Sequence, residues 1–122
     1  MTKEDELFNK GIIAFNNRQY YDAHEYWEDL WSDYQLKDAK FIQALIQLSV
    51  GYFHISNNNR NGALGLFKKC IPKFQLYLPT QRGININKIL KTINNAFDNI
   101  AEIDKMCDFD WKIVPKLKIN NE

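Results

Sequence analysis

Residues 20–31 read YYDAHEYWEDLW, and this stretch decides the fold. Because an α-helix advances by about 100° per residue, its large apolar side chains fall on one face. That face continues to Tyr34, whereas the preceding Asn16-Asn17-Arg18 interrupts the helical pattern. The stretch therefore predicts an amphipathic helix that buries a broad aromatic face against other helices.

Helical spacing of apolar residues recurs along most of the chain. It predicts further helices over about 3–16, 38–56 and 87–105, and one that begins near residue 60 and is kinked or ended by Pro72. Residues 38–56 are apolar almost all round, which is typical of a helix at the centre of a bundle. We therefore predict an all-α fold, a single-domain antiparallel helical bundle of about five helices. Its core helices span about 3–105, with a loop at 79–83 and an extended C-terminal tail at 106–122 laid on the bundle.

The chain also resembles itself at an offset of 40 residues. Four pairs match well: Gly11 with Gly51, Asn17 with Asn57, Ala23 with Ala63, and Trp27 with Phe67. The two small residues and the aromatic residue in each half follow the spacing of tetratricopeptide repeats. In such hairpins the small residues let paired helices approach, and the aromatic residue fills the gap. We expect two tetratricopeptide-like helical hairpins; a chance likeness is the alternative, and it too gives antiparallel helix pairs.

Charge and composition narrow the functional classes. Sixteen lysines and arginines nearly cancel 15 acidic residues, so no nucleic acid partner is expected. The apolar run over 41–55 is interrupted by polar residues and is interpreted as a buried helix, so no membrane association is expected. Two cysteines and the absence of a secretory leader pattern favour a reducing compartment. We expect a soluble protein of bacterial or plastid origin, cytoplasmic, or in the plastid stroma if organelle-encoded.

Polar residues stand at helical positions where a purely structural core would carry apolar ones. His24 and Glu28 are four residues apart and Trp31 follows three later, so the three share one edge of the aromatic face. The central helix carries its own polar stripe, made by Gln43, Gln47 and His54 with Gly51 between them. This stripe needs polar partners because an unsatisfied buried group costs about 1–3 kcal/mol. We predict that these two helices meet across a polar pocket lined by His24, Glu25, Glu28, Trp31, Gln43, Gln47, His54 and Asn59.

Three interpretations of this pocket stay open. It is a structural hydrogen-bond network, a site for a divalent metal with His24, Glu28 and His54 as ligands, or an acid–base site that acts on a small molecule. The pattern lacks the second histidine of the zinc-protease signature, and no nucleophile motif accompanies it. Catalytic residues and a cofactor therefore stay unassigned.

The same residues carry a resemblance to a known family. Residues 20–31, residues 41–47, His54 and the run from Asn59 to Gly62-Ala63 resemble the domain of unknown function 309 family, a group of small helical proteins. Its pattern is a His-Glu-x-x-Glu-x-x-Trp helix, a Gly-Leu-Ile-Gln helix ending in His, and a Gly-Asn-x-x-Gly-Ala turn. The chain departs from it at Ala44 and Asn58, where the family has glycine. The resemblance implies a helical bundle, supplies no activity, and points to His24, Glu25, Glu28, Trp31, Gln47, His54, Asn59 and Gly62.

The repeat and the absence of a complete catalytic signature favour a non-enzymatic binding or scaffold module. We expect a protein or peptide partner in a groove that the polar cluster organises. The alternative is a metal-dependent or acid–base enzyme that acts on a small molecule through His24, Glu28 and His54.

Overall fold

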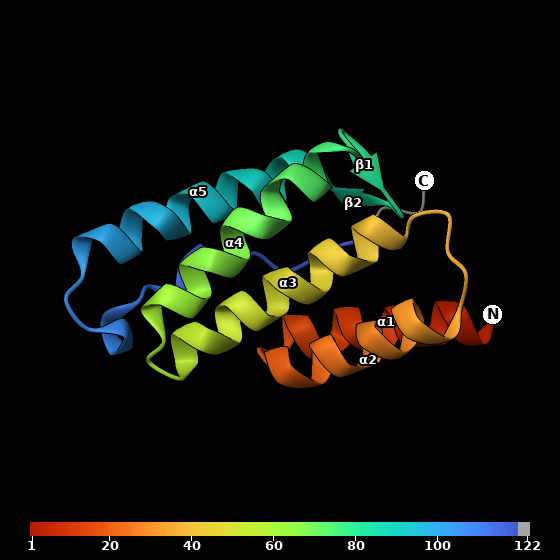
Figure 1. Ribbon diagram of the computed structural model, residues 1–122, viewed down its shortest axis with the longest axis horizontal. Helices are drawn as coiled ribbons and strands as arrows, with labels where there is room; N and C mark the ends of the chain where they lie inside the picture. The colour runs from red at the N-terminus through yellow and green to blue at the C-terminus, as the bar shows by residue number, and fades with distance from the viewer. Residues whose placement is uncertain (120–122) are drawn as a thin grey trace.

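The computed structural model describes residues 1–119, and these residues form an all-α bundle with a very small β-hairpin (Figure 1). The predicted fold class is therefore confirmed. The helices are α1 (Lys3–Asn16), α2 (Tyr20–Asp33), α3 (Ala39–Ser56), α4 (Arg60–Gln75) and α5 (Ile86–Glu102). Pro72 lies inside α4 rather than ending it, three residues before its last residue. None of the helices in this part of the chain is long and apolar enough to cross a lipid bilayer.

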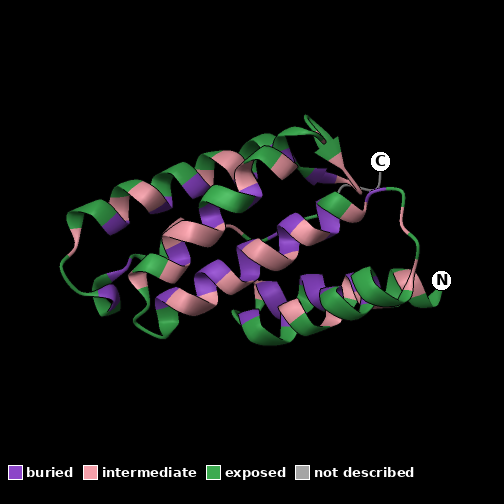
Figure 2. Ribbon diagram, viewed as in Figure 1, coloured by how far each residue is buried: buried purple, intermediate pink, exposed green. Residues whose placement is uncertain are grey.

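The helices pack in chain order. α1 lies against α2, α2 against α3, and α3 against α4, while α5 covers α4 on the far side (Figure 1). Buried residues face inward between these layers, and exposed residues run along the outer sides (Figure 2). The predicted position of α3 at the centre of the bundle is confirmed, because α3 packs on both sides.

The segment expected as a loop at 79–83 instead belongs to a hairpin of two strands, β1 (Thr80–Gln81) and β2 (Ile84–Asn85). Thr80 pairs with Asn85 and Gln81 with Ile84, antiparallel. The turn between the strands is made by Arg82 at φ 50° and Gly83 at φ 76°. Two consecutive residues with positive φ give the turn whose twist matches that of paired strands, and for this reason a hairpin forms here.

The C-terminal segment returns along the bundle, and its first part is not extended. It contains two short 3₁₀ turns, Met106–Asp108 and Trp111–Ile113, followed by extended chain. The side chain of Asn16 on α1 holds it in place: Asn16 Nδ2 donates to the Leu117 carbonyl at 2.9 Å, and the Leu117 amide donates to Asn16 Oδ1 at 2.7 Å. Residues 120–122 of the predicted tail lie outside the described residues.

The two helical hairpins share one turn geometry. The backbone N–H of Gln19 donates to the Ala14 carbonyl at 2.9 Å. Forty residues later the backbone N–H of Asn59 donates to the His54 carbonyl at 2.8 Å. The residue before each amide is in the left-handed region, with Arg18 at φ 62° and Asn58 at φ 59°. The sequence repeat therefore corresponds to a structural repeat of helix, turn and helix.

Each hairpin closes through a glycine on its first helix and an aromatic residue on its second. A Cβ on Gly51 would lie 2.6 Å from Cε1 of Phe67, and a Cβ on Gly11 would overlap the indole ring of Trp27. Trp27 is fully buried, and its Nε1 donates to the Phe8 carbonyl of α1 at 3.1 Å. The expectation that small residues admit the aromatic side chains is confirmed.

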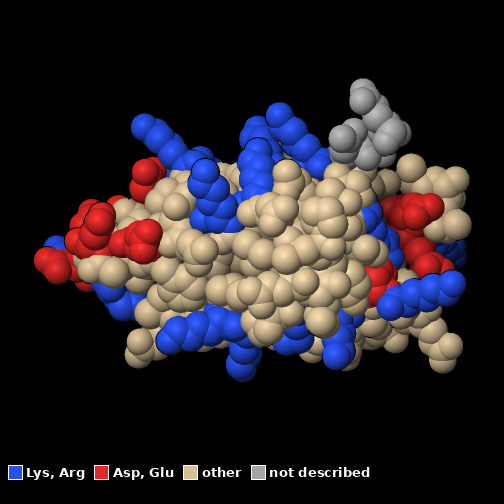
Figure 3. Space-filling view, turned by 90° about the horizontal axis from the view of Figure 1, so that it is seen from above, with Lys and Arg blue, Asp and Glu red and all other residues tan. Residues whose placement is uncertain are grey.

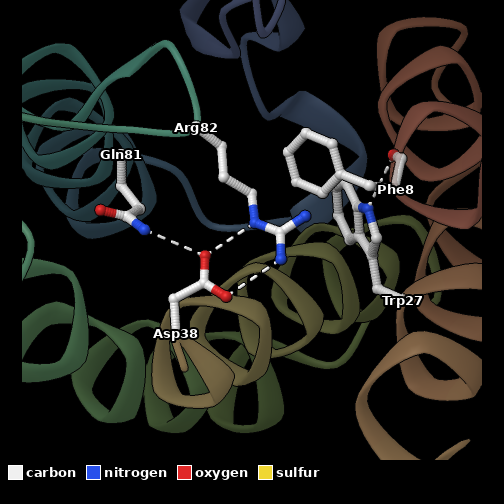
Figure 4. A network of polar contacts seen from close by, with 5 residues as sticks. All are labelled: Phe8, Trp27, Asp38, Gln81 and Arg82. Carbon is white, nitrogen blue, oxygen red and sulfur yellow. Dashed lines mark hydrogen bonds and ion pairs between the residues drawn. The ribbon is translucent and has the colours of Figure 1, made fainter. Parts of the chain in front are cut away.

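A partly buried ion pair ties the β-hairpin to the helices (Figure 4). The carboxylate of Asp38, just before α3, accepts hydrogen bonds from Arg82 Nε at 2.7 Å, Arg82 Nη2 at 3.0 Å and Gln81 Nε2 at 3.0 Å. Asp38 is only 8% exposed. The Arg82 guanidinium also lies over the Phe8 ring, 4.8 Å from its centroid, so the pair connects three segments far apart in the sequence.

The close approach of each hairpin leads to a stability prediction. Gly11→Ala and Gly51→Ala should each lower the free energy of unfolding by about 1–3 kcal/mol, because a methyl group must displace a buried ring. Gly65→Ala is the matched control, since its Cβ would meet nothing within 4 Å on α4. That variant should gain about 0.5–1 kcal/mol from helix propensity. Urea unfolding measures all three, and wild-type stability in both close-contact variants would contradict the packing described.

The Asp38 ion pair predicts a pH dependence. Burial raises the pKa of Asp38, but hydrogen bonds from Arg82 and Gln81 and the Arg82 charge outweigh burial and bring the pKa below its ordinary value. A lowered folded-state pKa stabilises the fold fully above the unfolded pKa of about 3.9, and this contribution is lost as pH falls through the folded-state pKa. Asp38→Asn should cost about 1–3 kcal/mol at pH 7, because the Arg82 guanidinium loses its charged acceptor.

Between pH 5 and pH 2 the Asp38→Asn variant should also lose less stability than the wild type, as measured by urea unfolding across pH. Asp98→Asn on the exposed side of α5 is the control and should keep the wild-type slope. If the free energy of unfolding fell equally with pH in the wild type and in Asp38→Asn, the ion pair would not be the cause of the stability loss in acid.

Candidate binding surface

The motif of α2 lies on the outer side of that helix. Glu25 and Glu28 are exposed, His24 is half-buried, and Trp31 is 42% exposed. Trp31, which the helical pattern grouped with the aromatic face, thus lies at the edge of that face. The fully inward positions of α2 are Tyr20, Ala23, Trp27 and Leu30.

His24 is held in one orientation on this surface. Its Nε2 lies 2.8 Å from Oε2 of Glu28, and its Nδ1 lies 3.2 Å from the Tyr21 carbonyl oxygen. Because the Glu28 side chain is 53% exposed, this pair adds little to stability. A depression of about 310 Å³ beside it is lined by His24, Glu25, Glu28 and Asp29.

His54 belongs to a different place, the turn between α3 and α4. Asn59 Oδ1 accepts the backbone N–H of Gly62 at 2.9 Å and so caps α4. The Asn59 amide nitrogen must then donate to Nδ1 of His54, 3.4 Å away. A Cβ on Gly62 would lie 2.6 Å from Asn59 Nδ2 and 2.9 Å from His54 Cδ2, so glycine is needed there. These three motif residues form a helix cap.

The polar stripe of α3 turns toward α4, which corrects the predicted pocket between α2 and α3. Lys73 Nζ of α4 donates to Gln47 Oε1 at 3.2 Å, and Gly51 receives the Phe67 ring of α4. His54 likewise contacts the start of α4. The physical reason is that Gly51 gives α4 the close approach, whereas α2 meets α3 through its own aromatic side chains.

The predicted site residues are therefore divided among three places: the outer side of α2, the α3–α4 turn, and the contact of Gln47 with Lys73. Gln43 is half-buried on α3. Across residues 1–119, no three His, Cys, Asp or Glu side chains are grouped so that they could hold a metal ion. The structure thus does not unite His24, Glu28 and His54 as one ligand set.

Sequence reasoning missed a cavity at the turn end of α2. It measures about 480 Å³, within the range of small ligand sites, and four of its eight lining residues are aromatic. Tyr21 and Phe53 contact one another there at 5.3 Å between ring centroids, and Trp111 stacks on Tyr20 at 5.8 Å. The lining residues are Arg18, Gln19, Tyr20, Tyr21, Asp22, Phe53, Ser56 and Trp111.

Two of the buried titratable side chains have raised pKa values. Burial raises the pKa of Tyr20 to about 12, despite the opposing Arg18 charge, so its phenol stays neutral. Burial likewise raises the pKa of the Cys70 thiol to about 12, which makes it a poor nucleophile.

The exposed Cys107 lines a second cavity of about 650 Å³, which shares Ser56 and Trp111 with the first. The two cavities therefore adjoin at the C-terminal segment.

Fold and site together define an all-α helical bundle with a motif-bearing helix on its surface. Residues 8–66 match the sequence model of the family described as Domain of unknown function (DUF309), which supports the resemblance that the motif residues carry. The match covers α2 and α3 completely and includes every motif residue from His24 to Gly62. Asn58, where the resemblance implies glycine, has a left-handed φ of 59°, a conformation that glycine adopts without strain. A comparison with curated proteins gave no match.

Because the motif residues lie partly in the α3–α4 turn and partly on the outer side of α2, substitutions at the two places should differ in their effect on stability. Asn59→Ala should lower the free energy of unfolding by about 1 kcal/mol, because α4 loses its cap, whereas Asn59→Asp keeps the capping oxygen and most of the stability. His24→Ala, on the outer side of α2, should stay within about 0.5 kcal/mol of wild type. Thermal or urea unfolding distinguishes these cases. A cost for His24→Ala equal to that of Asn59→Ala would mean that α2 also carries its motif for stability.

Proposed function

We propose that the protein is a non-enzymatic binding module that takes a peptide segment of a protein partner. The observation that carries this proposal is the aromatic cavity between the two hairpin turns and Trp111, which opens beside the exposed outer side of α2. An apolar side chain of the partner enters this cavity and is the anchor of the complex. Buried aromatic contacts of this kind supply most of the binding energy in protein interfaces.

The exposed aromatic residues support the same proposal. Tyr21 is 50% exposed and lines the cavity, and Trp31 is 42% exposed about three turns of helix later. Large aromatic side chains at the surface cost solvation energy and are enriched at interfaces. The tetratricopeptide-like plan of the hairpins also favours a peptide ligand, because stacked helical hairpins present extended binding surfaces.

The enzymatic alternative is supported less. It requires a metal or a proton relay that joins His24, Glu28 and His54, but His54 accepts a hydrogen bond from Asn59 in the α3–α4 turn. The pair of His24 and Glu28 alone has only a shallow depression beside it. A binding role uses these side chains where they lie, as polar groups beside an apolar anchor site.

A peptide-display selection tests the proposed function. The wild-type protein should enrich peptides that contain an aromatic or aliphatic anchor, and Phe53→Ala and Tyr21→Ala should weaken their binding by about tenfold or more, because both rings wall the cavity. Leu76→Ala is the matched control, since Leu76 is 64% exposed at the end of α4 and does not line the cavity. Circular dichroism verifies that each variant is folded. Enriched peptides that bind the cavity variants as tightly as the wild type would rule out this site.

A further inference from the structure

Charge is segregated between the helices although the chain as a whole is nearly neutral, with a formal net charge of +1. Helix α2 has no lysine or arginine and carries the carboxylates Asp22, Glu25, Glu28, Asp29 and Asp33. Helix α4 has the opposite composition, with Arg60, Lys68, Lys69 and Lys73 and no carboxylate. On the side that α4 and α5 cover, lysine and arginine side chains line both long edges (Figure 3). Acidic side chains also gather at the two ends of this view (Figure 3), and α2 differs from the other helices in that it has no lysine or arginine to offset its carboxylates.

Four of the α2 carboxylates form one ridge, which we call the acidic ridge: Asp22, Glu25, Asp29 and Asp33. Their spacings of three, four and four residues place them one above the other on the helix surface, and all four are exposed. Across residues 1–119, no lysine or arginine lies within ion-pair distance of them. The neighbouring Lys10 of α1 lies instead over the Tyr26 ring, 5.9 Å from its centroid. Like charges at this spacing repel one another, so the fold bears a cost that an external cation would relieve.

The acidic ridge begins at the cavity. Asp22 is both its first member and a lining residue of the aromatic cavity, and Tyr21 beside it is half exposed. A segment anchored in the cavity can therefore continue along α2 within reach of the ridge. Trp31, near the other end of the helix, offers a second exposed ring to a cationic side chain.

We propose that the partner segment is basic: its apolar anchor occupies the aromatic cavity, and lysine or arginine side chains that follow it pair with Asp22, Glu25 and Asp29 on the acidic ridge. This inference rests on the proposed function and names the chemistry of the partner. Charge complementarity carries it, because the ridge is unpaired, exposed and continuous with the cavity. Pairs between exposed charges act mainly on specificity and association rate, so binding must weaken with salt.

Fluorescence anisotropy with two labelled probes tests the inference. The basic probe is a peptide of alternating lysine and leucine, and the neutral probe replaces each lysine with glutamine. The ridge variant combines Asp22→Asn, Glu25→Gln and Asp29→Asn. The control variant combines Glu6→Gln, Asp98→Asn and Glu102→Gln, which removes the same charge from exposed sites on α1 and α5. The ridge variant should bind the basic probe about tenfold more weakly at low salt, and the control variant should stay within about twofold of wild type.

A single change of opposite sign sharpens the test. Arg18 also lines the cavity, so Arg18→Gln should tighten binding of the basic probe by about twofold or more, whereas Asp22→Asn should weaken it. If the site recognised only apolar groups, neither substitution would change the affinity for the basic probe. The neutral probe should bind more weakly than the basic one and be insensitive to the ridge variant.

The outcomes separate this inference from the proposed function. Equal binding of both probes, weakened by Phe53→Ala but not by the ridge variant, would overturn the basic partner and leave the binding module standing. Binding of neither probe would count against both. Light scattering of the pure protein tests one more alternative, in which a second copy of the chain occupies the surface through the lysines of its α4. A dimer that the ridge variant dissociates would overturn the assignment to a separate basic partner.

Discussion

The placement of Trp27 against Gly11 is the contact on which the rest of the structure depends. The indole ring occupies the space that a side chain on Gly11 would fill, and its Nε1 is bonded to the Phe8 carbonyl, so the rotation of α2 about its axis is fixed relative to α1. Gly51 and Phe67 repeat the arrangement forty residues later and fix α4 on α3. Because α2 must present Trp27 inward, it necessarily presents the side with Glu25 and Glu28 outward.

That rotation explains why one family motif serves two purposes. On α2 the motif residues are on the outer side, where packing does not require their identity, and they adjoin the acidic ridge and the cavity. In the α3–α4 turn, Asn59 and Gly62 meet the exact steric and hydrogen-bonding needs of a helix start, and His54 completes the cap. The ion pair of Asp38 and Arg82 holds the β-hairpin against the helices, and the contact of Asn16 with Leu117 holds the C-terminal segment. The C-terminal segment supplies Trp111 to the cavity wall.

Much of the fold could be predicted from the sequence, because it is encoded in local periodicity. Helix α1 has the predicted bounds, and the self-comparison found both glycine–aromatic contacts. The partner of the α3 polar stripe could not be predicted, since a helical wheel shows which residues share a side but not which neighbour covers it. The pair of Asp38 and Arg82 joins residues 44 positions apart and leaves no periodic signal. The β-hairpin was missed because its strands have two residues each, although Arg82-Gly83 was a turn signal. The cavity was missed because it needs Trp111 from outside the repeat.

Hydrogen exchange of the three tryptophan indole N–H groups, followed by NMR, tests the rotation of α2 most directly. Trp27 is 0% exposed and donates to a buried carbonyl, so its indole proton should be strongly protected and exchange only when the bundle opens. Trp31, four residues later and 42% exposed, should exchange quickly. The reverse order, with Trp31 protected and Trp27 exchanging freely, would place the motif side of α2 inside the bundle and contradict the account.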